Sequence, residues 1–135
     1  MSLITWTDDL SVKVAQIDTQ HKKLVDLINS LHLAMKQRKA DEALGGVIES
    51  LVNYAIEHFR TEEKYFDEFD YLEGEQHKKE HMDFVYKVAA FKNDFDRGKM
   101  MLPLEIMEFL KDWFINHVKK TDMAYSDFFV KKGLS

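Results

Sequence analysis

The chain has 135 residues, a formal net charge of −5 and no cysteine. Without cysteine it can have no disulfide, no thiolate zinc site and no cysteine nucleophile, and its negative charge argues against nucleic acid or an anionic membrane as a partner. No apolar run approaches the ~18 residues that span a bilayer, and nothing near the N-terminus resembles a signal peptide. We therefore expect one domain over residues 1–135, in the cytoplasm.

Helix-favouring residues dominate the composition, with only one proline and five glycines. Residues 1–17 lack helical periodicity and are expected to form an extended arm, anchored by Trp6, Leu10, Val12, Val14 and Ile17. Apolar residues then recur at spacings of three and four, which predicts long helices at about 18–38, 41–66, 75–97 and 103–120. A short C-terminal helix is expected around Tyr125, Phe128 and Phe129.

Several residues suit the ends of these helices. Asp18 or Thr19 suits the N-cap of the first helix, and Asp41 suits that of the second. Gly98 fits the C-terminal cap of the third helix, and Pro103 fits the first turn of the fourth. Four helices with short connections predict an all-α, up-down-up-down antiparallel four-helix bundle with an extended N-terminal arm and a short C-terminal helix.

The apolar stripe of each long helix contains polar residues that are able to bind metals. They are His21, His58, Glu62, His77, His81 and His117. Members four residues apart share one helix face. Counting the helical rise from each connection places all of them at one level of the bundle, near the end where the first helix begins.

Asp122 follows His117 by five residues, a spacing that an α-helix does not favour. On an ideal α-helix, side chains five residues apart point about 140° away from each other. Both face the bundle interior only if the fourth helix ends between them or contains a π-type bulge there. With Asp122 included, five imidazoles and two carboxylates converge.

A metal centre explains this cluster better than separate core residues do. A lone histidine on an apolar face is usually a hydrogen-bonded core residue, but seven such groups at one level would be costly to bury unpaired. Seven ligands exceed the four of a structural zinc site, and Ca²⁺ or Mg²⁺ would not select imidazole. Two transition metals bridged by the two carboxylates fit the count, and iron is the metal we expect.

The ligand set also bears on reactivity. Three histidines fill one metal to six-coordinate, whereas the other two leave the second metal one open position for a small diatomic ligand. Five neutral imidazoles favour the reduced metal pair, unlike the carboxylate-rich set of ferritin-like di-iron enzymes. This favours O₂ binding over catalysis. A di-iron enzyme that handles O₂, peroxide or NO, with weak oxidase or peroxidase activity, is one alternative, and a metal-dependent signalling module is another.

The same residues resemble the hemerythrin family. The order His…His-x-x-x-Glu…His-x-x-x-His…His-x-x-x-x-Asp is that of the hemerythrins, and the segments HFRTEE, HKKEH and LKDWFINHVKKTD resemble the bacteriohemerythrins. The resemblance covers nearly the whole chain. It implies reversible O₂ binding, for O₂ transport, storage or sensing, at two iron ions joined by an oxide or hydroxide.

The resemblance also implies roles for individual residues. It assigns His77, His81 and His117 to one iron, His21 and His58 to the iron that binds O₂, and Glu62 and Asp122 to both. It implies an apolar O₂ pocket, although ordinary core packing would explain its members equally well: Leu24, Phe59, Trp113, Phe114 and Val118. The family often has an aliphatic residue at position 114, so the bulkier Phe114 affects pocket size and O₂ access.

Other expectations concern ligands and neighbouring residues. O₂ is the expected partner, with NO or small anions such as azide as further ligands, and no nucleic-acid or membrane partner is expected; a protein partner is unknown. His32 is expected on the bundle flank and not at a metal, and Glu63 is expected to be a solvated neighbour of Glu62. Tyr125 is expected either to contact the metal ligands or to serve in packing.

Overall fold

The computed structural model describes residues 4–98 and 102–135, and these residues form an all-helical fold. The four long helices are α1 (Ala15–Lys36), α2 (Ala40–Phe69), α3 (Gly74–Asp96) and α4 (Leu102–Trp113). The fourth continues as a π-helical segment, η2 (Phe114–Asp122), then as the 3₁₀ turn η3 (Met123–Tyr125) and α5 (Ser126–Lys131). The predicted all-α four-helix bundle with a short C-terminal helix is confirmed. Within the described ranges, no helix is long and apolar enough to cross a membrane.

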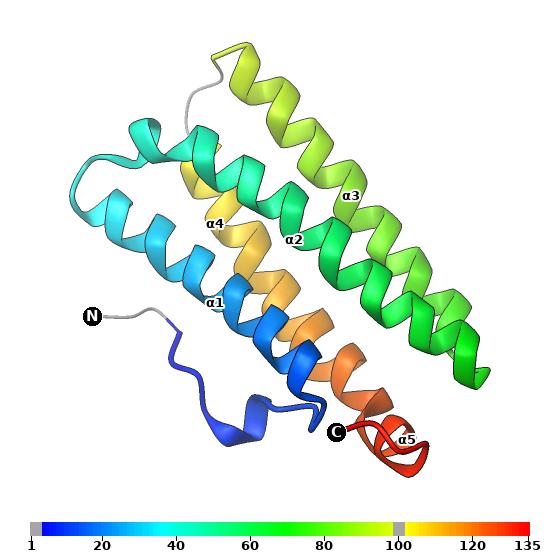
Figure 1. The fold of residues 1–135 in the computed structure, drawn as a ribbon. Coiled ribbons are helices and arrows are strands. Elements are labelled where there is room, and N and C mark those ends of the chain that lie inside the picture. The colour runs from blue at the N-terminus through cyan, green and yellow to red at the C-terminus, as the bar shows by residue number, and fades with distance from the viewer. Residues whose placement is uncertain (1–3, 99–101) are drawn as a thin grey trace.

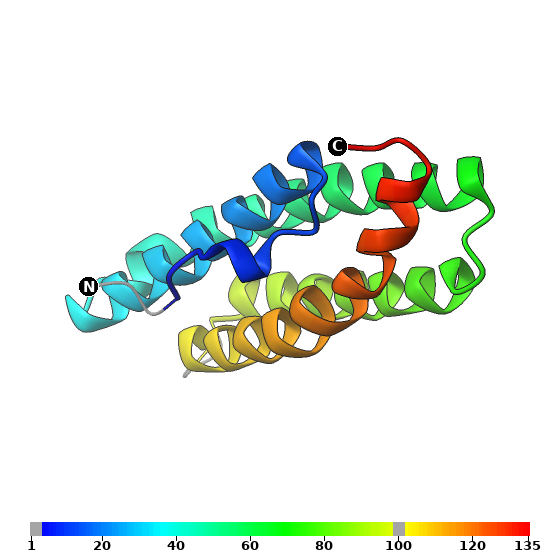
Figure 2. The same cartoon turned by 90° about the horizontal axis from the view of Figure 1, so that it is seen from below.

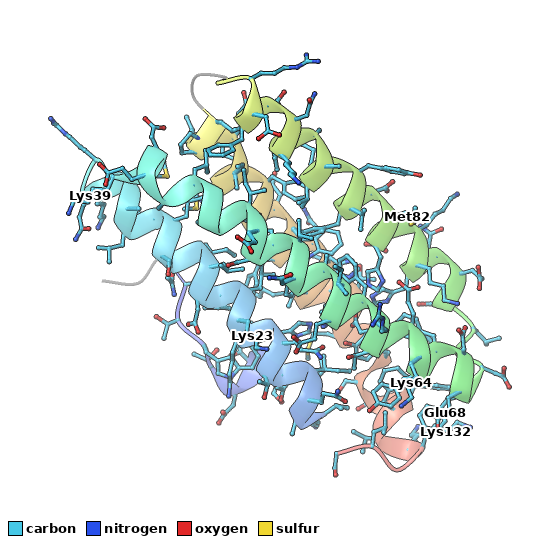
Figure 3. The ribbon with its side chains drawn as sticks, turned by 45° about the horizontal axis from the view of Figure 1, so that its top comes forward. Lys23, Lys39, Lys64, Glu68, Met82 and Lys132 are labelled. Atoms are coloured by element: carbon cyan, nitrogen blue, oxygen red, sulfur yellow. The ribbon has the colours of Figure 1, made fainter. Side chains whose placement is uncertain are left out.

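The helices run antiparallel and form two layers. Figure 1 shows α1 beside α2, and Figure 2 shows these two helices in one layer with α3 and α4 in the other. α5 turns back across the end of the bundle where α1 begins, and the C-terminus lies near that end (Figures 1 and 2). Charged side chains such as Lys23 on α1 and Lys64 on α2 lie on the outside (Figure 3).

The N-terminal arm lies along the bundle and contains one 3₁₀ turn, η1 (Asp8–Leu10). Its apolar residues are buried as predicted, namely Leu10, Val12 and Val14. The amide of Asn29 on α1 holds the arm, because it exchanges hydrogen bonds of 2.9 and 2.8 Å with the backbone N–H and carbonyl of Ile4. Residues 1–3 of the predicted arm lie outside the described residues.

The first helix begins earlier than predicted. Its N-cap is Val14 and its first residue is Ala15, so the predicted caps Asp18 and Thr19 both lie inside α1. The Asp18 carboxylate instead accepts a 2.8 Å hydrogen bond from the backbone N–H of Val12. It therefore fixes the angle between the arm and the helix, a tertiary role that local capping preferences do not reveal.

The second helix is longer than predicted. Its N-cap is Lys39, so the predicted cap Asp41 lies in the first turn, where a carboxylate still interacts favourably with the helix dipole. The helix continues to Phe69 and ends because Asp70 adopts a left-handed conformation, with φ 52° and ψ 50°. The connection to α3 is consequently shorter than the predicted turn region 67–74.

The predicted C-terminal cap of the third helix and the predicted first turn of the fourth helix are correct, whereas α4 itself ends at Trp113 and not near residue 120. Gly98 follows the α3 C-cap residue Arg97 with a φ of 73°, a left-handed conformation that glycine adopts without a Cβ penalty. Pro103 lies in the first turn of α4, where its missing N–H would have no helical partner.

Two apolar clusters hold the bundle together, and a polar layer separates them. The larger cluster fills the middle of the bundle. The smaller cluster joins the arm, the start of α1, α2, η3 and α5, and it consists of Val12, Val14, Ile17, Phe66, Tyr125 and Phe129. Along α1, His21 separates Ile17 of the smaller cluster from Leu24 of the larger one. The polar layer therefore lies near the end where α1 begins, at the level that the sequence predicts.

Candidate metal centre

Seven polar side chains meet in the layer between the two apolar clusters. α1 contributes His21, α2 contributes His58 and Glu62, α3 contributes His77 and His81, and η2 contributes His117 and Asp122. None of them is more than 2% exposed. The structure thus brings together all seven residues that the sequence predicts to converge.

The seven side chains form two groups that share both carboxylates. Glu62 and Asp122 belong to both groups; the first adds three histidines, His77, His81 and His117, and the second adds two, His21 and His58. Within each group the potential ligand atoms lie within 4.8 Å of one another. The three-to-two division of histidines equals the division that the sequence resemblance implies.

Asp122 faces both groups with different oxygens. Its Oδ2 lies 2.9 Å from Nε2 of His21. Its Oδ1 lies 2.7 Å from Nε2 of His77 and 3.0 Å from Nε2 of His117. This arrangement allows one carboxylate to bridge two metal ions.

Glu62 faces both groups with a single oxygen. Its Oε1 lies 3.0 Å from Nε2 of His58 and 3.0 Å from Nε2 of His81. The Tyr125 hydroxyl donates a hydrogen bond to Oε2, the other oxygen. Tyr125 is fully buried, and its ring stacks on Phe129 at 4.6 Å. Both roles considered for Tyr125, contact with a metal ligand and packing, are therefore present.

Some of the closest contacts in the cluster are not hydrogen bonds. His81 Nε2 and Glu62 Oε1 are 3.0 Å apart, yet neither atom has a hydrogen-bond partner in the described part of the chain. Asp122 Oδ1 is in the same situation. These buried ring-nitrogen and carboxylate-oxygen atoms converge on one another. A cation bound among them would satisfy all of them, and imidazole with carboxylate is a donor set that suits transition metals.

The π-helical geometry of η2 explains how two polar residues five apart share one face. A π-helix forms hydrogen bonds between residues five apart, so His117 and Asp122 lie on the same side. The side-chain hydroxyl of Thr121 also reaches back five residues and donates to the carbonyl of Asn116 at 3.2 Å. Of the two alternatives that the sequence leaves open, the π-type geometry is correct.

Three of the histidines contact a polar side chain through Nδ1, the ring nitrogen that faces away from the cluster. His58 contacts Gln20 at 2.8 Å, His81 contacts Glu63 at 2.9 Å, and His117 contacts Glu80 at 3.0 Å. Such contacts fix the ring orientation and leave Nε2 free for a metal. Glu63 is partly exposed, as expected for a solvated neighbour of Glu62, but its carboxylate also orients His81, a role that was not expected.

Charges inside the cluster shift the pKa values of its members. Burial lowers the pKa of His58, but Glu62 and Asp122 outweigh it and raise the pKa to about 9. Burial also opposes the charged form of His77, but the nearby carboxylates of Asp122 and Glu62 raise its pKa to about 10. Burial would raise the pKa of both carboxyls, yet the neighbouring histidines hold both values well below the ordinary range. Protons thus balance the carboxylates in the metal-free cluster.

The residues expected to line an apolar ligand pocket are all buried next to the polar layer, in the larger cluster: Leu24, Phe59, Trp113, Phe114 and Val118. Two of them stack on cluster histidines. Phe59 lies 3.9 Å from His81, and Trp113 lies 3.9 Å from His117, between ring centroids. Core packing accounts for these positions, and a role in ligand binding stays a prediction.

Sequence patterns did not reveal the side chains around the cluster. Gln20 and Glu80 lie outside the apolar stripes, and the sequence gives only their positions directly before His21 and His81 as a signal. His32 is partly buried and belongs to neither group of potential metal ligands in the described residues, which agrees with the expected place on the bundle flank.

Known proteins resemble this chain in sequence. The family described as "Hemerythrin HHE cation binding domain" matches residues 12–128. A bacteriohemerythrin of Stenotrophomonas maltophilia is 34% identical over 94% of this chain and 82% of its own length. A bacteriohemerythrin of Methylococcus capsulatus is 31% identical over 93% of this chain and 95% of its own length.

The fold also resembles a solved structure. The crystal structure of a wild-type hemerythrin superposes on this chain with a TM-score of 0.82 and 29% sequence identity. The match covers 93% of this chain and 97% of the other. A buried cluster able to hold metal therefore occurs here in a fold that known hemerythrins share.

Proposed function

This chain belongs to the hemerythrin family, and on that premise we propose that it binds O₂ reversibly at a non-haem di-iron centre. We treat residues 1–135 as one hemerythrin-like domain, which the family match over residues 12–128 supports. Its cytoplasmic location stays a prediction, as does its use in O₂ transport, storage or sensing.

The proposed ligands are the seven cluster residues. His77, His81 and His117 would hold one iron, His21 and His58 would hold the other, and Glu62 and Asp122 would contact both. One observation carries the proposal: two groups of donors share both carboxylates but contain different numbers of histidines. Unequal histidine numbers leave the two-histidine position with one fewer protein ligand, so a small molecule can bind there. When bound, the iron pair would supply the electrons that O₂ accepts on binding.

The protein's own side chains determine what the centre does. Five of the seven ligands are imidazoles, and this neutral set favours the reduced metals, whereas di-iron enzymes of ferritin-like bundles use about four carboxylates. The apolar residues beside the cluster slow the entry of bulk water, which limits irreversible oxidation. We therefore propose a binding protein and not an enzyme, with NO or small anions such as azide as further ligands.

Metal analysis and gas titration test this proposal. Protein loaded with ferrous iron under nitrogen should contain two irons per chain, bind one O₂ per chain and release it under vacuum. A visible absorption band should appear when O₂ is added and disappear when O₂ is removed under vacuum. The same protein loaded with Zn²⁺ is the matched control and should not respond to O₂, because zinc has no redox chemistry. Irreversible oxidation without a reversible band would contradict the proposal, and steady turnover of peroxide or NO would indicate an enzyme.

A further inference from the structure

The larger apolar cluster contains two polar atoms that no described protein group satisfies. The Tyr54 hydroxyl and the indole Nε1 of Trp113 are both buried, and neither has a hydrogen-bond partner among residues 4–98 and 102–135. Tyr54 is only 4% exposed and Trp113 only 9% exposed. Because buried polar groups are almost always partnered, two unsatisfied groups in one cluster point to a missing ligand.

Both groups lie one helical turn from a cluster histidine. Tyr54 precedes His58 by four residues on α2, and the two rings stack at 5.2 Å. Trp113 precedes His117 by four residues at the end of α4, and these rings stack at 3.9 Å. The phenol and the indole therefore lie in the apolar layer directly beside the proposed metal centre, and they reach it from two different helices.

The phenol and the indole also share two aromatic neighbours. The ring of Phe84 lies next to both, with centroid distances of 5.9 Å to Tyr54 and 4.6 Å to Trp113. Phe59 contacts both as well, at 6.0 and 5.9 Å. A phenol ordinarily ionises only at about pH 10, so the O–H of Tyr54 can donate a hydrogen bond at neutral pH.

The two groups cannot satisfy each other. An indole N–H only donates, whereas a phenol O–H both donates and accepts. The pair therefore has two protons and a single acceptor oxygen. Even if the indole of Trp113 donates to the phenol, the proton of Tyr54 still has no acceptor. What is missing is an electron-rich atom that belongs to neither side chain.

We propose that Tyr54 and Trp113 form a hydrogen-bonding subsite that binds the outer, electron-rich atom of a small ligand at the two-histidine metal position. This subsite rests on the proposed function. Since it offers protons inside an apolar pocket, it selects small linear anions such as azide or cyanate over apolar molecules of similar length. Water fills it when no such ligand is bound. The subsite is thus the specificity-determining part of the pocket.

Azide binding tests the subsite directly. Oxidised, iron-loaded protein is titrated with azide and followed by visible absorption, for the wild type, for Tyr54→Phe and for Tyr86→Phe. Tyr86 is the matched control, because its side chain on α3 is 66% exposed. We expect Tyr54→Phe to weaken azide binding about tenfold, the effect of one hydrogen bond to an anion, and Tyr86→Phe to leave it unchanged. Equal affinities for the wild type and Tyr54→Phe would overturn the subsite.

A second measurement needs no metal. Removing a dry, unpartnered hydroxyl from a core stabilises a protein, whereas removing a hydroxyl that holds water does not. The melting temperature of metal-free Tyr54→Phe should therefore equal that of the metal-free wild type or lie below it, and a rise would overturn the subsite. A wild-type protein that bound neither O₂ nor azide would overturn the proposed function as well. O₂ binding with unchanged azide affinity in Tyr54→Phe would overturn the subsite alone.

Discussion

The outer ring nitrogens of the histidines distinguish the two groups of the cluster. In the three-histidine group, Nδ1 of His81 and Nδ1 of His117 both contact carboxylates. In the two-histidine group, Nδ1 of His58 contacts a neutral amide, and Nδ1 of His21 has no partner in the described chain. A carboxylate partner makes an imidazole a stronger metal donor. The three-histidine position is therefore expected to hold its metal more tightly.

Glu80→Gln tests this difference. The variant keeps the shape of the side chain that contacts His117 but removes its charge, so the affinity of the three-histidine position should fall roughly 10–100-fold. Metal removal by a competing chelator measures the change. Glu57→Gln is the control, because Glu57 is exposed and pairs with the exposed Lys23 of α1 at 3.1 Å. Equal metal retention in the two variants would mean that the Glu80 contact does not tune the site.

His58→Ala tests the two-histidine position. The variant should lose O₂ binding, and the metal-free protein should lose about 3 kcal/mol of unfolding free energy, because Glu62 loses a buried charge partner. Metal analysis, gas titration and thermal unfolding measure these effects. The control is His32→Ala, since His32 is partly buried and lies outside both groups. A folded His58→Ala protein that still bound two irons and O₂ would contradict the assignment.

Residue positions were predictable from the sequence where they follow helix periodicity. The seven cluster residues lie on apolar stripes or next to them, so counting turns placed them at one level. Gln20 and Glu80 lie off the stripes, and their contacts depend on how each helix is rotated against its neighbour. Tyr54 was missed for a related reason, because a single buried aromatic residue has no pattern that separates a ligand contact from packing.

The helices themselves were predictable, but their ends were less so. Asp18 and Asp41 are favourable N-cap residues, yet both lie inside the first turn of their helices. Asp18 contacts the arm instead, which is a tertiary contact that competes with capping. The π-helix is a similar case. The spacing of His117 and Asp122 left two geometries open, because either one turns both side chains inward, and only the structure shows that the segment is a π-helix.

Exchanging the residues at positions 121 and 122 tests the π-helix. The double variant Thr121→Asp/Asp122→Thr keeps the composition and charge but moves the carboxylate to four residues after His117. Four residues is the spacing that an α-helix brings to one face, whereas η2 brings five to one face. The variant should therefore hold at most one of the two metals, as measured by metal analysis. A variant that held both metals would mean that η2 adopts α-helical geometry in the metal-bound protein.

At the scale of the whole molecule, a buried charged layer divides the core in two. The larger cluster lies on one side of it, and the smaller cluster, which ties the arm to α5, lies on the other. In the metal-free protein, protonated histidines neutralise the two carboxylates. With metal bound, the metal takes the place of those protons. The stability of the whole bundle is therefore coupled both to pH and to metal.

This coupling predicts opposite pH trends with and without metal. The folded-state pKa values of His58 and His77 are about 9 and about 10, above the ordinary 6.5. Their stabilisation is fully present below pH 6.5 and is lost as the pH rises through the folded values. The metal-free protein should thus lose at most on the order of 8 kcal/mol of unfolding free energy between about pH 6.5 and 10, since each pKa unit corresponds to about 1.4 kcal/mol. The carboxyl pKa values are lowered, so their contribution is present above about pH 4 and is lost only in acid.

Bound metal should oppose the loss of stability above about pH 6.5, because a metal binds neutral imidazole and competes with its proton. Stabilisation by metal should therefore increase with pH over the range in which the metal-free protein weakens. The test compares the melting temperatures of chelator-treated and metal-loaded protein at about pH 6 and about pH 9. The difference in melting temperature between the two forms should be larger at the higher pH. Parallel curves would mean that the metals do not replace the protons of the histidine cluster.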